Sequence, residues 1–391
     1  MKALRIIFMA VLLAFMGSVA QGDHSEKPRF PAGTYKMTGK IHLKDEYRMY
    51  DSAVVILEEG LKFFPDDAEM HFLLGKAYFH KKNPRGMGEQ FALAESLQGN
   101  KEAKWKEELN EMKLETWMQT YNQGVSAYKE QDFDAALKNF ETCTVINPSD
   151  ARAFWLCGDT YRVKGQYEQA IAALETGLKL APDDAQILRS YADVLFYVGR
   201  GEEALEKYGE VLEKDPKNVD VLFNVATIHY SAGDYDHAIS RFQELVAADP
   251  AYKDAHFNMG SAYLLKIGQM DKALDSLKDE SGEYLKDEKS TAKIQELTQK
   301  RDDFVVSSQA AFEKVLELDS TDMEAQGHLA QLYLKQEKYD QAVIMLETMV
   351  EKDSTNCKAW QQLAFIYAKK NIGEKANQAY KKAQDCMGGG K

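Results

Sequence analysis

The decapeptide GDYDHAISRF, residues Gly233–Phe242, has counterparts at fixed distances along the chain. QDFDAALKNF begins at 131, GQYEQAIAAL at 165 and GRGEEALEKY at 199, so each of these segments starts 34 residues after the one before it. EKYDQAVIML, which begins at 337, has the same pattern. Internal periodicity of this length indicates a solenoid, in which each unit buries its apolar face against the next unit.

The repeated unit has small residues and prolines at matching places. When the unit is numbered from Trp117, position eight holds Gly or Ala in five successive units, and in the first four of them position twenty holds Ala and position thirty-two holds Pro. Small side chains let two antiparallel helices approach closely, and proline ends the second helix because it has no backbone N–H to donate. These residues are Gly124, Gly158, Ala192, Ala226 and Gly260 at position eight, Ala136, Ala170, Ala204 and Ala238 at position twenty, and Pro148, Pro182, Pro216 and Pro250 at position thirty-two.

These features resemble the tetratricopeptide repeat (TPR), a helix–turn–helix unit of 34 residues. The resemblance covers nearly all of the chain after residue 33, and it implies an all-α, right-handed α–α superhelix of about eight to nine helical hairpins. The predicted units span 34–67, 68–101, 117–150, 151–184, 185–218, 219–252, 253–322, 323–356 and 357–391.

Two stretches interrupt the period. In residues 102–116, Trp105, Leu109, Met112 and Thr116 recur at helical spacing, which predicts a long first helix running from about Lys101 into the next unit. The unit 253–322 is 36 residues longer than the others, and residues 279–303 within it are dense in charge. We expect an extended second helix there, and the insertion is either inert surface or an arm that binds a partner.

The first twenty residues resemble a secretory signal peptide. Lys2 and Arg5 precede an apolar run that ends at Met16, and small residues follow up to Ala20. We therefore predict cleavage after Ala20, a flexible lead-in over 21–33, and no stable membrane span in the mature chain. An uncleaved anchor helix is the alternative, although the apolar run is short for a span. Export to a bacterial periplasm is expected, with secretion as the other possibility.

The charge and motifs argue against several classes of function. The formal net charge is −13, which disfavours binding to nucleic acid. Asp234, His237 and Ser240 raise the question of a charge relay, but they occupy ordinary repeat positions, and no glycine-rich elbow accompanies them. His229 takes position eleven, which is usually a tyrosine, so we expect it to be packed or half-packed and not to be a ligand. We predict no enzyme, no catalytic residues, no metal site and no cofactor.

The chain has four cysteines, and export would let disulfides persist. Cys143 and Cys157 lie almost symmetrically about the turn near Asp150, so antiparallel helices place them opposite each other. The sequence leaves open whether they form a bond or are free core thiols. Cys357 and Cys386 are symmetric about a later turn, and a bond between them would clip the terminal repeat.

The resemblance also implies a binding surface, because TPR arrays present the first helix of each unit on a concave face. Rings recur at positions five and twelve, asparagines at position six can hydrogen-bond a peptide backbone, and three arginines can contact an anion or carboxylate. The predicted groove residues are Phe72, Tyr121, Asn122, Tyr128, Arg152, Trp155, Arg162, Arg189, Phe223, Asn224, Tyr230, Phe257 and Asn258.

The resulting hypothesis is a non-catalytic scaffold of the bacterial cell envelope that binds a protein or peptide segment in the concave groove. The alternative is an accessory subunit of an envelope, secretion or cell-wall machinery, which binds through the charged insertion 279–303. The sequence does not fit the two-carboxylate clamp of chaperone-binding TPRs, because lysine and asparagine are not at the required positions. It names neither the partner nor the oligomeric state.

Overall fold

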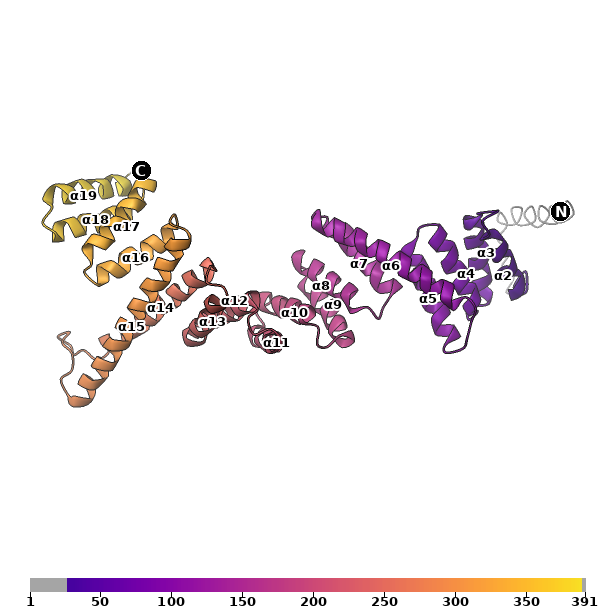
Figure 1. Cartoon of the computed structure of the whole chain (residues 1–391), viewed down its shortest axis with the longest axis horizontal. Helices are drawn as coiled ribbons and strands as arrows, with labels where there is room; N and C mark the ends of the chain where they lie inside the picture. Colours follow the sequence, from indigo (N-terminus) through magenta and orange to yellow (C-terminus); the bar gives the residue numbers. More distant parts are fainter. Residues whose placement is uncertain (1–26, 389–391) are drawn as a thin grey trace. The chain divides into compact units, whose positions relative to one another are not determined.

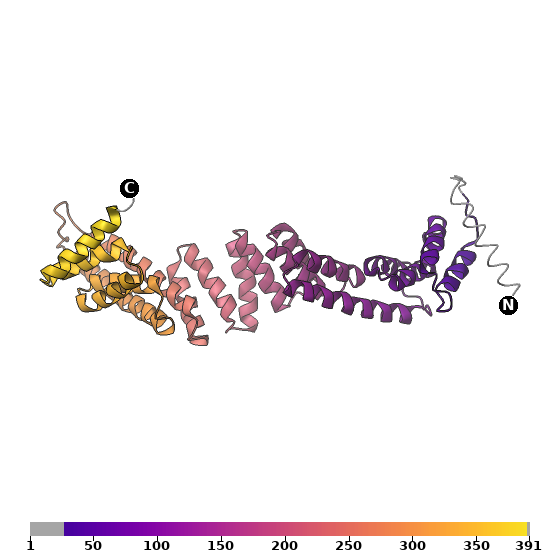
Figure 2. The same cartoon turned by 90° about the horizontal axis from the view of Figure 1, so that it is seen from above.

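The computed structural model describes residues 27–388, and this range is helical with no strand. Eighteen helices follow one another as nine antiparallel hairpins (Figures 1 and 2). The all-α solenoid predicted from the 34-residue period is therefore confirmed. The predicted signal peptide at 1–20 and the first part of the lead-in lie outside the described residues.

The chain divides into two compact units, the first ending at Asp183 and the second beginning at Asp184. The first unit contains α2 (Ala32–His42), α3 (Tyr50–Phe63), α4 (Ala68–His80), α5 (Pro84–Gln98), α6 (Lys106–Lys129), α7 (Phe133–Ile146), α8 (Ala151–Val163) and α9 (Tyr167–Leu180). The second contains α10 (Ala185–Tyr197), α11 (Gly201–Lys214), α12 (Val219–Ser231), α13 (Tyr235–Ala248), α14 (Lys253–Asp275), α15 (Glu288–Leu318), α16 (Met323–Lys335), α17 (Tyr339–Lys352), α18 (Cys357–Lys369) and α19 (Gly373–Gly388).

Local chemistry sets where the first helix of a hairpin begins. In six of the nine hairpins the residue before the first helix is an Asp or Asn whose side chain accepts a hydrogen bond from a backbone N–H two or three residues further on, which satisfies an otherwise free donor. Asp150 does this before α8, and Asp184 does it before α10. The other first helices with such a cap are those after Asp67, Asn218, Asp322 and Asn356.

The turn inside each hairpin is equally regular. Eight hairpins have a residue with positive φ at repeat position fifteen, a conformation that glycine adopts without a steric penalty. Where this residue is not glycine, its side chain makes the conformation cost roughly 1 kcal/mol or more. The eight residues are Arg48, Lys82, Gln131, Gly165, Gly199, Gly233, Glu337 and Asn371.

Small residues at position eight bring the two helices of a hairpin into direct contact. A Cβ atom added to Gly158 would lie 2.4 Å from Cγ of Leu174, which is fully buried. The same holds at Gly75, where the added atom would lie 2.4 Å from the ring of Phe91. Real side chains do not approach this closely, so these glycines are required by packing.

Both interruptions of the period become helix. The first makes α6 a helix of 24 residues, which starts at Lys106 instead of at the predicted Lys101. The second lengthens two helices, α14 to 23 and α15 to 31 residues, whereas we predicted an extension of the second helix only. The prediction missed α14 because Ile267 and Leu274 continue its buried face past the expected end.

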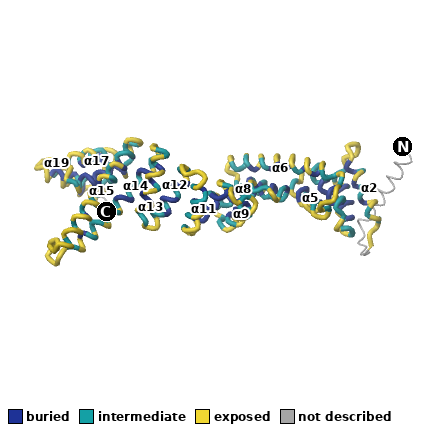
Figure 3. The backbone as a smooth tube through the Cα atoms, turned by 60° about the horizontal axis from the view of Figure 1, so that its bottom comes forward, coloured by how far each residue is buried: buried dark blue, intermediate teal, exposed yellow. Residues whose placement is uncertain are grey.

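The extended ends of α14 and α15 form an arm, which we define as residues 271–303. The loop at its tip is closed by an isolated bridge between Lys278 and Tyr284. Residues 278–289 are exposed without exception (Figure 3). The tip therefore owes its shape to its own hydrogen bonds, since no neighbouring helix buries it.

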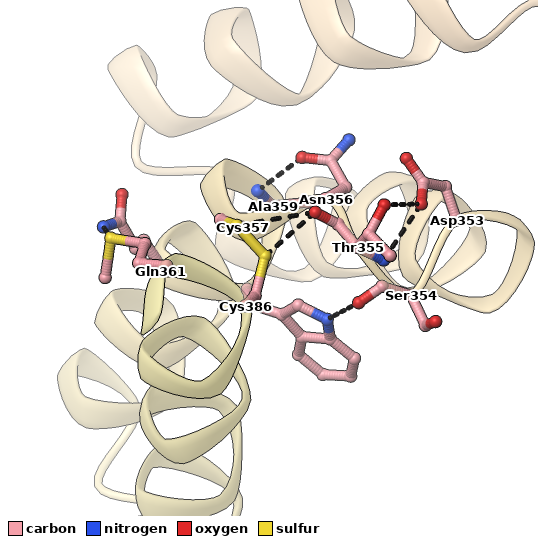
Figure 4. Close-up of a disulfide and its surroundings, with 10 residues drawn as sticks. Asp353, Ser354, Thr355, Asn356, Cys357, Ala359, Gln361 and Cys386 are labelled. Carbon is pink, nitrogen blue, oxygen red and sulfur yellow. Dashed lines mark hydrogen bonds between the residues drawn. A yellow bond between two sulfur atoms is a disulfide. The ribbon is translucent and has the colours of Figure 1, made fainter. Parts of the chain in front are cut away.

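The cysteines fall into two classes. Cys357 at the start of α18 and Cys386 near the end of α19 form a disulfide with their Cα atoms 5.5 Å apart (Figure 4). Both sulfur atoms lie close to the carbonyl oxygen of Thr355 (Figure 4). The bridge joins the first helix of the terminal hairpin to the second.

The alternative of a Cys143–Cys157 bond is wrong for this structure, in which both are free, buried thiols. The two side chains belong to different apolar clusters, since Cys143 packs with Trp117 and Ile146 whereas Cys157 packs with Phe140. Burial raises the pKa of Cys143 to about 12 and also raises that of Cys157. Both thiols are therefore protonated and unreactive at neutral pH.

Candidate functional site

A cavity that contains three of the predicted groove residues lies along α6, and we call it the α6 hollow. It has a volume of about 590 Å³. One face of α6 and the turn into α8 line it. The lining residues are Asn110, Lys113, Leu114, Trp117, Met118, Tyr121 and Asn122 from α6, with Asn147, Asp150 and Arg152 from the turn and the start of α8.

Aromatic rings and a guanidinium form part of this lining. The rings of Trp117 and Tyr121 stack with centroids 4.9 Å apart, and the Arg152 guanidinium lies 4.8 Å from the centre of the Trp117 ring. Arg152 also pairs with Asp150 at 2.6 Å, and this hydrogen bond holds the pKa of the Asp150 carboxyl below its usual value. Asp150 also caps α8. The Asp150 carboxylate thus holds the Arg152 guanidinium in place next to the Trp117 ring.

Two apolar side chains of the α6 hollow are open to solvent. Leu114 is 62% exposed and Met118 is 53% exposed, and both line the hollow between amide groups of Asn110 and Asn122. Exposed apolar side chains grouped in a concave surface are typical of a binding site. The arrangement can take an apolar side chain, while the amides can hydrogen-bond a peptide backbone.

The structure brings three of the predicted groove residues together here: Tyr121, Asn122 and Arg152. Sequence reasoning missed Leu114, because the inserted stretch 102–116 was considered only for its buried face, and it missed Met118, because only rings, asparagines and arginines of the repeat were selected. The signal was present, since these residues continue the helical spacing of Trp117 and Tyr121.

The prediction that Phe72 lines an open groove is wrong. Phe72 is buried, at 4% exposure, and its ring stacks on those of Phe91 and Trp105, at 6.0 and 5.2 Å between centroids. Trp105 comes from the insertion before α6. The inserted residues therefore cover the position that an uninterrupted array would leave open.

The remaining groove residues of the first unit are engaged in contacts within the chain. The Tyr128 hydroxyl donates to Asp159 Oδ2 at 2.6 Å, and Arg162 pairs with the same carboxylate at 2.6 Å. Burial, followed by this acceptor, raises the pKa of Tyr128 to about 12. Trp155 is half-buried on α8. These residues stabilise the hairpins against each other.

In the second unit, Asn224 is also committed. Its amide nitrogen donates to Asp193 Oδ1 and to the Tyr208 hydroxyl, both at 3.0 Å, so this N–H group already has partners within the chain. Arg189 pairs with Asp220 at 3.0 Å. Arg152 and Arg162 also pair with aspartates. The positive charge of each of the three arginines is therefore already neutralised within the chain, which does not favour the predicted contact with an anion.

The rings predicted at positions five and twelve of the second unit are half-buried. Phe223 contacts Tyr252 at 5.3 Å, and Phe257 contacts Phe312 at 5.5 Å between centroids. Tyr230 meets Tyr235 at 5.7 Å, and burial raises the pKa of the Tyr230 phenol. Asn258 lies beside Phe257 and is half-buried. The aromatic rings join neighbouring helices, as core residues do.

A second hollow lies at the tip of the arm, with a volume of about 490 Å³. Tyr284 and Leu285 line it and are 41% and 39% exposed, and Ile294 adds apolar surface from the start of α15. This hollow falls within the charged insertion that the sequence suggested as an alternative binding region.

Comparison with known proteins identifies the repeat type. Residues 118–254 match the family model of the cytochrome c-type biogenesis protein H TPR domain, and residues 307–366 match a model of the tetratricopeptide repeat. No curated protein matches the chain significantly.

Several solved structures are similar to this chain. The C-terminal part of a TPR repeat-containing protein from Cytophaga hutchinsonii aligns with a TM-score of 0.53 and 15% identity, over 69% of this chain and 99% of that one. A tetratricopeptide repeat protein from Parabacteroides merdae gives 0.42 and 14%, over 69% and 93%. YrrB, described as a TPR protein with an unusual peptide-binding site, gives 0.38 and 18%, over 53% and 88%.

The fold is thus that of a non-enzymatic repeat scaffold, a class that binds protein or peptide partners. Tetratricopeptide repeats occupy residues 118–254 and 307–366 of the chain. Within residues 27–388, no helix combines the length and apolar character that crossing a membrane requires.

Proposed function

We propose that this chain is an exported scaffold of the cell envelope and that its α6 hollow holds an extended segment of a protein partner. The observation that carries the proposal is the exposure of Leu114 and Met118 beside the stacked rings of Trp117 and Tyr121. Burying two half-exposed apolar side chains of this size contributes roughly 1 to 3 kcal/mol to binding, enough to favour a matching partner over water.

The chemistry of the α6 hollow indicates the segment it would take. An apolar side chain would lie against Leu114 and Met118, and amides of Asn110 and Asn122 would bond the partner's backbone. The Arg152 charge is compensated by Asp150, so a strongly acidic segment is not required. The partner is therefore an extended, mainly apolar stretch of protein.

A site-specific photocrosslinker tests this proposal. Benzoylphenylalanine replaces Met118 in one strain and Val55 in another, since Val55 is 50% exposed but lies outside the α6 hollow, on α3. After irradiation of cells, we expect a defined adduct at position 118 that is absent at position 55. The variant Leu114→Glu with the crosslinker at 118 should lose the adduct and keep its helical circular dichroism. Equal labelling at both positions would contradict the proposal.

A second candidate function has its own observation behind it. The tip of the arm exposes Tyr284 and Leu285 on a hollow that no other helix covers, and one matched TPR model is named for cytochrome c-type biogenesis. The chain would then be an accessory subunit of an assembly machinery, and the arm would make the contact. Tyr284→Ser with Leu285→Ser should abolish partner capture in that case, whereas under the first proposal capture would survive.

Export is part of the proposal and has a direct test. Lys2, Arg5 and the apolar run before Met16 support cleavage after Ala20. Mass spectrometry of the mature chain should find Gln21 as the first residue, and fractionation should place the protein in the periplasm. A full-length chain in the cytoplasm would contradict export without affecting the α6 hollow.

A further inference from the structure

Three metal-binding side chains meet at the turn between α12 and α13. His229 lies near the end of α12, Asp234 caps α13, and His237 lies in the first turn of α13. Both histidine Nδ1 atoms contact the same carboxylate oxygen, Asp234 Oδ2, at 3.2 Å from His229 and 2.7 Å from His237. One donor atom from each residue lies within 4.8 Å of the others.

Packing does not account for His229, as comparison with the other repeats shows. At position eleven five of the other units have a tyrosine, and each of these bonds a side chain twenty residues earlier, on the preceding helix; the remaining units have Lys44, Ala127 and Leu195 there. Tyr161 donates to Glu141 at 2.6 Å, and Tyr333 donates to Glu313 at 2.7 Å. The same pairing joins Tyr78 to Glu58, Tyr263 to Gln243 and Tyr367 to Glu347.

For His229 the residue twenty positions earlier is Gly209, which has no side chain to accept a hydrogen bond. A Cβ added to Gly209 would meet nothing within 4 Å. The usual anchor of this repeat position is thus missing, and the His229 ring instead lies over the His237 ring, with centroids 5.2 Å apart and planes 25° from parallel.

The backbone holds the three donors in place before any ligand arrives. Gly233 takes a positive φ of 78° and closes the turn, and the Asp234 N–H donates to the His229 carbonyl oxygen at 2.9 Å. Oxygen Oδ1 of Asp234 accepts the His237 N–H at 3.4 Å. Oxygen Oδ1 thus orients the carboxylate, and Oδ2, which both imidazoles contact, is the oxygen that would face a bound ion. Hydrogen bonds of this kind support the ligands of metal sites.

We propose that His229, Asp234 and His237 bind a divalent transition-metal ion of the zinc, copper or nickel class. Two imidazoles and one carboxylate suit these ions, whereas calcium and magnesium prefer a shell of oxygen atoms. Without metal each Nδ1–H donates to the Asp234 carboxylate. On metal binding each neutral imidazole would carry its proton on Nε2 instead and offer the lone pair of Nδ1. Three protein ligands leave a fourth position of a tetrahedral ion to water.

This assignment departs from the expectation from the sequence, which predicted no metal site and explained His229 by packing at position eleven. The structure also gives no support to a charge relay through Asp234, His237 and Ser240. The hydrogen bonds of the cluster run from the histidines to Asp234, while Ser240 is exposed one turn further along α13. Bound metal would clamp the end of α12 to the start of α13 and stabilise this hairpin.

Metal titration of the mature chain, purified without a histidine tag, tests the proposal. We expect calorimetry to show Zn²⁺ bound with one-to-one stoichiometry, and Co²⁺ to give the visible absorption bands of a tetrahedral nitrogen and oxygen site. His237→Ala should weaken Zn²⁺ binding at least tenfold. The control His80→Ala removes a histidine outside the cluster and should leave Zn²⁺ binding unchanged.

A second variant guards against loss of folding. His229→Tyr combined with Gly209→Glu rebuilds the tyrosine–glutamate pair of the other repeats, so it should keep or raise the thermal midpoint while losing Zn²⁺ and the Co²⁺ bands. The proposal is overturned if wild type binds none of Zn²⁺, Cu²⁺, Ni²⁺ and Co²⁺, or if either cluster variant binds Zn²⁺ as wild type does.

Discussion

Replacing two helical glycines by alanine should have opposite effects on stability, although the substitution is the same. Gly209 lies inside α11, and an added Cβ would meet nothing within 4 Å. Alanine is better than glycine in a helix by about 1 kcal/mol, so Gly209→Ala should stabilise by about that amount. Gly158 lies inside α8, where the added Cβ would be 2.4 Å from Cγ and 2.8 Å from Cδ2 of Leu174.

Leu174 has no room to retreat, because it is fully buried. Overpacking of this kind costs about 1 to 3 kcal/mol, and a contact more than 1 Å short of the normal distance belongs at the upper end. After the gain in helix propensity is subtracted, Gly158→Ala should destabilise by about 2 kcal/mol. The two variants should therefore differ by about 3 kcal/mol.

The assay is native-state hydrogen exchange, because a long repeat array need not unfold in a single step. Amide protection in α8 and α9 should fall for Gly158→Ala, and protection in α11 should rise for Gly209→Ala. The double variant Gly158→Ala with Leu174→Ala should be less destabilised than the sum of the two single changes, because the added methyl group occupies part of the space that Leu174 leaves. If both glycine variants gain protection, close helix contact is not what position eight requires.

Three further predictions follow from individual contacts. Burial raises the pKa of the Tyr78 phenol from 10.0 to about 12. The neutral phenol therefore stabilises the fold below pH 10, and this contribution is lost as the pH rises toward 12. Over this pH range the urea midpoint of Tyr78→Phe should decline less steeply than that of wild type. Cys357→Ser opens a loop of 29 residues to Cys386, which should cost about 3 kcal/mol locally and speed hydrogen exchange in α19 while leaving the first unit unchanged. Trp105→Ala removes the ring stacked on Phe72, which should cost about 1 to 3 kcal/mol and lower amide protection in α4, whereas unchanged protection would show that the insertion does not cover this position.

The fold was predictable because each rule of the repeat acts locally. A small residue at position eight, a turn at position fifteen and a proline after the second helix each specify one geometric step, and together they determine a hairpin. The pairing of Cys357 with Cys386 was predictable for the same reason, since both residues belong to one hairpin. The Cys143–Cys157 pairing failed because symmetry about a turn does not determine which core a side chain enters.

The binding surface was less predictable, because it depends on which residues remain uncovered once neighbours are in place. Asn224 has the residue type for contact with a peptide, yet Asp193 and Tyr208 use its amide. Phe223 lies at a predicted groove position but contacts the rings of Tyr252 and Phe242. Repeat position indicates the direction of a side chain, whereas the neighbours decide whether it is available.

The insertion before α6 shows how a departure from the repeat can both remove and create a site. Trp105, in this insertion, stacks on Phe72 and buries the side chain that the repeat pattern predicted to be exposed in the groove. Its later residues extend α6, so that Leu114 lies exposed in the hollow beside Tyr121. The same logic applies to Gly209, whose missing side chain leaves His229 without the usual partner of position eleven. In a solenoid the regular positions are occupied by packing, and chemistry specific to one chain is therefore to be sought where a unit departs from its neighbours.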